Sequence, residues 1–199
     1  MSAIHEHVLQ NGMTLLCWPQ RHLHGLEFGL YLKGGPLYET EETQGISNLL
    51  EHLCFRGLGG LNREGLLREL NRFGTNLDAA TYAEGLVFRL KCLPRFFDAA
   101  LEYFLRFFAN VPWTPEQIAA EKQVVLRQLE ADGDGDLFDR AACDFRKTEN
   151  GAFPPLGTPE SLMALTEADI QLWQAMIFQP QNACLVMTGN FSNEALINT

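Results

Sequence analysis

The chain has 199 residues, of which 46% are hydrophobic, and this length and composition suit one globular domain with its own core. Its formal net charge of −10 at pH 7 and the lack of a basic cluster argue against a nucleic-acid-binding protein. No apolar run is long enough for a membrane span, and the first residues lack the pattern of a secretory signal. The five cysteines form no C-x-x-C pair, so we expect reduced thiols in a cytoplasmic protein.

Alternating apolar and polar residues predict strands at both ends of the chain and near its middle. An Asn11-Gly12 turn joins the first two strands as a hairpin. The predicted strands cover residues 7–9, 14–18, 26–32, 76–82, 86–93 and 183–188.

Helical periodicity predicts helices between these strands. Gly74 is a plausible C-cap, and Thr114-Pro115-Glu116-Gln117 has the residues of a helix start. The apolar stripe of one helix is expected to be core packing; it consists of Phe97, Leu101, Phe104, Leu105 and Phe108. The predicted helices cover residues 45–55, 63–73, 95–110, 115–130, 137–147 and 167–178. These elements predict an α+β fold, a mostly antiparallel sheet with helices packed on one side, in a single domain over residues 1–199.

The helix predicted at residues 45–55 carries a zinc-peptidase motif in which one residue is changed. In the intact H-x-x-E-H motif, two histidines one turn apart bind zinc, and the glutamate acts as general base on zinc-bound water. Here Glu51 and His52 remain, and Asn48 stands at the first histidine position. A neutral amide oxygen is a poorer zinc ligand than an imidazole, so the motif predicts a lost or weakened metal site.

Several blocks of the sequence, in order, resemble the N-terminal domain of the pitrilysin/insulinase-like zinc peptidases, a family that includes the mitochondrial processing peptidases. The blocks cover residues 35–40, 45–57, 78–88, 121–128 and 180–190. The resemblance implies the fold predicted above. It also implies that the chain is the N-terminal half of a longer, two-domain protein.

The resemblance further implies the positions of the zinc ligands. The family's third ligand is a glutamate seven residues after another glutamate; Gln128 stands at the ligand position, and Glu121 at the upstream, second-shell position. Glu130 is near but points to another face of the helix. Two of the three ligand positions, Asn48 and Gln128, therefore carry amides, and no cofactor is expected. We expect these amides to hydrogen-bond to each other, to His52 or to Glu51.

An inactive family member is expected to keep the ability to bind peptide. The resemblance implies that the strand carrying Asp78, Ala79, Ala80 and Thr81 is the peptide-binding edge, with Glu51 as a vestigial general base. The sequence thus predicts a catalytically inactive peptidase homologue that binds peptide or completes the chamber of an active partner. The expected partners are an unfolded polypeptide segment and an active pitrilysin-like subunit, as in a heterodimer, or a second similar domain.

One alternative is an active zinc metalloendopeptidase with an altered metal site. Zinc would then be held weakly by His52 and Glu51 together with a residue such as Glu121, or by a relocated ligand, His22 or His24.

Overall fold

The computed structural model describes residues 4–109, 112–131 and 153–191. Within these residues one six-stranded sheet has the order β1-β2-β8-β3-β7-β6. Its strands are β1 (His5–Val8), β2 (Thr14–Pro19), β3 (Leu26–Lys33), β6 (Leu77–Tyr82), β7 (Gly85–Cys92) and β8 (Ala183–Gly189). Every neighbouring pair is antiparallel except β2 and β8, which run parallel. The predicted, mostly antiparallel sheet is confirmed.

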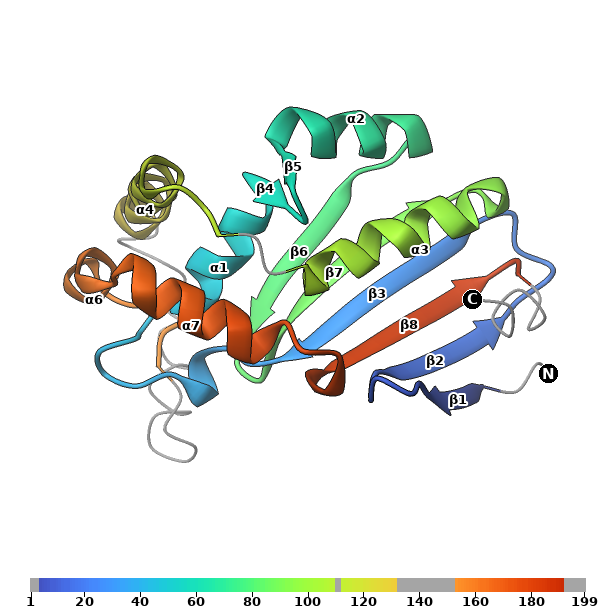
Figure 1. Ribbon diagram of the computed structural model, residues 1–199, viewed down its shortest axis with the longest axis horizontal. Coiled ribbons are helices and arrows are strands. Elements are labelled where there is room, and N and C mark those ends of the chain that lie inside the picture. The colour runs from blue at the N-terminus through green and yellow to red at the C-terminus, as the bar shows by residue number, and fades with distance from the viewer. Residues whose placement is uncertain (1–3, 110–111, 132–152, 192–199) are drawn as a thin grey trace.

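Helices cover one face of this sheet (Figure 1). They are α1 (Ile46–Cys54), α2 (Arg63–Phe73), α3 (Phe97–Leu105), α4 (Pro115–Ala131), α6 (Pro159–Ala164) and α7 (Glu167–Ile177). The opposite face carries exposed side chains such as Trp18 and Tyr31. The α+β class is confirmed. None of the helices in the described ranges is long and apolar enough to cross a membrane.

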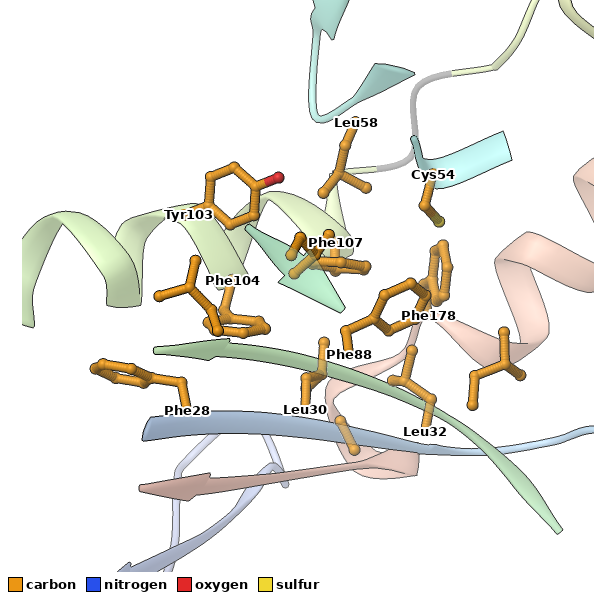
Figure 2. Packing of buried hydrophobic residues seen from close by; sticks show 14 of the residues in the cluster. Phe28, Leu30, Leu32, Cys54, Leu58, Phe88, Tyr103, Phe104, Phe107 and Phe178 are labelled. Carbon is orange, nitrogen blue, oxygen red and sulfur yellow. The ribbon is translucent and has the colours of Figure 1, made fainter. Parts of the chain in front are cut away.

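The core lies between the sheet and α3 (Figure 2). Phe28 of β3 and Phe88 of β7 point towards the helical layer. The Phe28 and Phe104 ring centroids lie 5.9 Å apart, and those of Phe88 and Phe107 lie 4.4 Å apart. These rings bury a large apolar area and hold α3 across β3 and β7.

The end of this helix differs from the prediction. The α-helix stops at Leu105, and Arg106–Phe108 is a 3₁₀ turn. The tighter turn brings Phe107 into the core, whereas Leu105 is exposed and Phe108 is half-buried. The predicted stripe is therefore correct up to Phe104 and wrong at Leu105.

Helix α6 and a small hairpin of β4 (Gly57–Leu58) and β5 (Leu61–Asn62) were not predicted. A signal for α6 exists, because Thr158 and Ser161 form a capping box ahead of it. The helix predicted at residues 137–147 lies outside the described residues.

Candidate functional site

The N-terminal end of α1 is capped by the side chain of Glu39. The Glu39 carboxylate accepts hydrogen bonds from Gly45 N at 2.8 Å and from Ser47 N at 3.0 Å. Gly45 has φ = 83°, a left-handed conformation that favours glycine. Trp173 Nε1 donates to Ser47 Oγ at 3.1 Å, which ties α1 to α7. Glu39 was not predicted to cap this helix, although a carboxylate preceding a helix is a recognisable signal.

Replacing Glu39 with alanine is expected to lower the free energy of unfolding by about 1–2 kcal/mol, because two buried N–H groups lose their acceptor. Urea denaturation measures this change. The control is Glu41→Ala, which alters an exposed carboxylate two residues away and should change stability by less than about 0.5 kcal/mol. Equal effects of the two substitutions would refute the capping role.

The motif residues of α1 contact two different elements. Glu51 Oε2 accepts a hydrogen bond from Thr81 Oγ1 of β6 at 2.5 Å. His52 Nδ1 lies 3.4 Å from Glu121 Oε2 of α4. Glu51 therefore links α1 to the edge of the sheet, and His52 links it to α4.

Asn48 does not form the amide network predicted from the sequence. Its residue is 9% exposed, and its Oδ1 atom is buried and has no hydrogen-bond partner. Gln128 is exposed on α4. The prediction is therefore wrong for Asn48 Oδ1: replacement of the histidine leaves an unsatisfied acceptor on the site helix, which is costly for a buried group.

Glu121 is 5% exposed and contacts the side chains of His52 and Arg56. The Arg56 guanidinium donates to Glu121 Oε1, and His52 approaches Oε2. Burial alone would raise the pKa of this carboxyl, but hydrogen bonds from His52 and Arg56 and the charges of both side chains hold the pKa below its usual value. Contact between His52 Nδ1 and a carboxylate is how metal-binding histidines are commonly oriented. Glu121 therefore contacts His52, and its predicted second-shell role stays a prediction.

For the Glu51 carboxyl and the Cys54 thiol of α1, burial is the largest cause of the pKa shift. Burial raises the pKa of the Glu51 carboxyl, although the Thr81 hydrogen bond and the nearby His52 oppose the shift. Burial raises the pKa of the Cys54 thiol well above its usual value, and the Glu51 charge adds to this effect. Cys54 is fully buried in the core and is a structural residue.

The side chains at the family's ligand positions do not fit a zinc ion. A catalytic zinc site needs three good protein ligands, and this one has one imidazole, that of His52, with amides at positions 48 and 128. In the parts of the chain that the structure describes, no three His, Cys, Asp or Glu side chains form a group able to hold a metal. His24 lines a pocket together with Gly25 and Leu26 at the start of β3, and among the described residues neither His22 nor His24 belongs to a group of three potential metal ligands.

The predicted peptide-binding residues lie on β6, at one edge of the sheet. Asp78 is exposed, whereas Ala79, Ala80 and Thr81 are half-buried. Pairing with β7 uses one side of β6, and no described strand pairs with its other side. The structure therefore places Thr81, the partner of Glu51, on an unpaired sheet edge.

The sequence profile described as "Insulinase (Peptidase family M16)" matches residues 24–142, more than half of the chain. The chain belongs to the M16 peptidase family. An "Uncharacterized zinc protease" of Rickettsia felis is 25% identical over 194 residues, which are 96% of this chain and 47% of the relative. The beta subunit of the mitochondrial-processing peptidase of Caenorhabditis elegans is 24% identical over 172 residues, 85% of this chain and 38% of the relative.

Solved structures show the same fold. A protease from Helicobacter pylori has a TM-score of 0.90 at 21% identity, covering 99% of this M16 chain and 49% of that one. A peptidase M16 inactive domain from Pseudomonas fluorescens has a TM-score of 0.82 at 16% identity, covering 98% of this chain and 48% of that one. The chain thus spans about half the length of these structures and of the Rickettsia felis relative.

Proposed function

We propose that this M16 domain is a catalytically inactive peptidase homologue that binds an extended peptide at β6, or completes the chamber of an active partner. The observation that carries the proposal is that two of the three predicted zinc-ligand positions on α1 and α4 hold amides, Asn48 and Gln128. Without a metal, water keeps its high pKa, and Glu51 has no activated nucleophile to assist. Glu51, His52 and Glu121 then serve to hold α1 against β6 and α4.

The unpaired edge of β6 supports the peptide-binding half of the proposal. An extended peptide adds to such an edge through main-chain hydrogen bonds and places little demand on its own sequence. The small side chains of Ala79 and Ala80 leave the neighbouring backbone accessible to an added strand. The partner is an active pitrilysin-like subunit or a second similar domain, and the half-length match to the relatives supports a longer, two-domain protein.

The second candidate function is an active metalloendopeptidase with an altered site. Its support is the retention of Glu51 and His52 together with the orienting contact from Glu121. Only this second candidate function requires zinc as a cofactor. The two functions differ in whether bound peptide is cleaved.

Peptide binding at β6 is tested with the paired variants Ala79→Pro and Ala80→Pro. Successive N–H groups of a strand point to opposite sides, so one proline removes a donor facing β7 and the other removes a donor on the open edge. The native chain is expected to bind a labelled unstructured polypeptide such as casein in fluorescence anisotropy. The open-edge variant is expected to bind it about tenfold more weakly at unchanged thermal stability.

The other proline variant is the matched control and should lose stability, because it breaks the β6–β7 ladder. Absence of polypeptide binding by the native chain, or unchanged affinity in both variants, would overturn the binding function. Mass spectrometry after incubation with zinc reports on catalysis. Intact polypeptide is expected, and cleavage that needs Glu51 would establish the second candidate function instead.

A further inference from the structure

A pocket of about 780 Å³ lies at the end of the sheet away from α1. It forms where β3 begins and β7 and β8 end, beside the C-terminus of α2 (Figure 1). Four segments distant in sequence contribute to it, at residues 23–27, 71–75, 91–96 and 188–189. The pocket shares no residue with the α1 motif or with β6.

The lining of this pocket is basic in a chain of net charge −10. Arg72, Lys91 and Arg95 contribute cations from two of these segments, and Glu27 is the acidic residue of the lining. Lys91 Nζ lies 3.6 Å from Glu27, and Arg72 lies 3.6 Å from Glu69 on its own helix. Exposed pairs of this kind are worth less than about 1 kcal/mol, so a bound anion can compete for both cations.

The backbone beside the pocket also favours negative charge. Leu93 and Arg95 line it at the 3₁₀ turn Pro94–Phe96, which leads into the nine-residue helix α3. The N-terminal end of a helix carries partial positive charge, which favours an anion beside it.

The C-terminal end of α2 also borders the pocket and carries partial negative charge, but its last carbonyl groups are capped by backbone hydrogen bonds. Gly74 N donates to Asn71 O at 3.0 Å, and Thr75 N donates to Leu70 O at 3.1 Å. These bonds satisfy two terminal carbonyls, so the positive groups of the pocket outweigh this helix end.

One wall of the pocket is apolar. Phe73 and Phe96 line it with ring centroids 5.8 Å apart, and Leu26 and Leu93 lie beside them. The Arg95 guanidinium sits 4.8 Å from the Phe96 ring centroid, a cation–π contact that places a charge at the margin of this wall. The cavity thus joins an aromatic surface to a group of cations.

We propose that this pocket binds a small ligand with an oxyanion, a phosphate or a carboxylate, on an apolar or aromatic body. The oxyanion contacts Arg72 and Arg95, and the body packs on Phe96 and Leu93, which are at least partly exposed. Arginine suits this role because its planar fork donates two parallel hydrogen bonds to such groups. This site is independent of the peptide edge and of the function proposed for it.

Phenyl phosphate and phenylacetate are the probes, titrated into the isotope-labelled 199-residue chain and followed by amide chemical shifts. Saturable shifts are expected at Gly74, Thr75, Leu93 and Gly189. Arg72→Gln/Arg95→Gln is expected to weaken binding by about tenfold or more. The control, Arg63→Gln/Arg68→Gln, removes the same charge from α2 outside the pocket and should leave the affinity within about twofold.

The two probes distinguish the two kinds of ligand: binding of phenyl phosphate alone indicates a phosphate, and binding of phenylacetate alone indicates a carboxylate. The proposal is overturned if neither probe gives saturable shifts, or if neutral benzyl alcohol binds as tightly as both. It is also overturned if the control variant loses as much affinity as Arg72→Gln/Arg95→Gln. The spectra report in the same experiment that each variant is folded.

Discussion

Replacing Asn48 with histidine and Gln128 with glutamate is expected to convert a chain that retains no zinc on dialysis into one that binds it stoichiometrically. The double variant has two imidazoles and a carboxylate at the three ligand positions, as a catalytic zinc site requires. His52 needs no reorientation, because its Nδ1 atom already faces Glu121. Structural zinc sites are worth about 10–16 kcal/mol, so restoring two ligands should change the affinity by several orders of magnitude.

Elemental analysis after dialysis against micromolar zinc measures this gain. Asn71→His/Gln123→Glu is the matched control, because it makes the same chemical changes at exposed positions on α2 and α4. Both single variants should retain little zinc, since each leaves an amide at one ligand position. Stoichiometric zinc in the native chain would contradict the inactive-homologue proposal directly.

Replacing Glu121 with alanine is expected to destabilise the protein by about 2–3 kcal/mol at neutral pH. The substitution leaves the partly buried Arg56 guanidinium without its carboxylate partner and removes the Glu121 contact of His52. Both side chains keep some contact with solvent, 28% exposed for Arg56 and 19% for His52, which limits the loss. Glu130→Ala, at an exposed position on the same helix, is the control and should change stability by less than about 0.5 kcal/mol.

The loss of stability caused by Glu121→Ala should become smaller as the pH falls. The pKa of Glu121 is lower in the folded than in the unfolded chain, so its contribution is fully present above the unfolded pKa. That contribution falls as the pH drops through the folded pKa. Urea denaturation at several pH values should therefore show the native and Glu121→Ala curves converging in acid. A gap that stays constant with pH would rule out an ionic role for Glu121.

The sequence by itself determined the strands of the main sheet and most of the helices that cover it. Alternation predicted the strands of the main sheet, and Gly74 ends α2 in the left-handed conformation expected of a C-cap. Gln128 was identified through the resemblance to a known family, whereas Asn48 was identifiable from the motif itself, because it stands four residues before His52. Such features depend on residues a few positions apart, which is the range over which periodicity and capping act.

The tertiary structure decided which distant residues meet. It placed β6 at the edge of the sheet, brought Thr81 to Glu51, and set Glu121 between His52 and Arg56. It also left Asn48 Oδ1 without a partner, where the sequence suggested a paired amide. The basic pocket is formed by four segments that are far apart in the sequence, so no local sequence pattern predicts it. These contacts depend on how the helices pack across the sheet. That packing is determined by the apolar contacts of the whole core, to which many segments contribute.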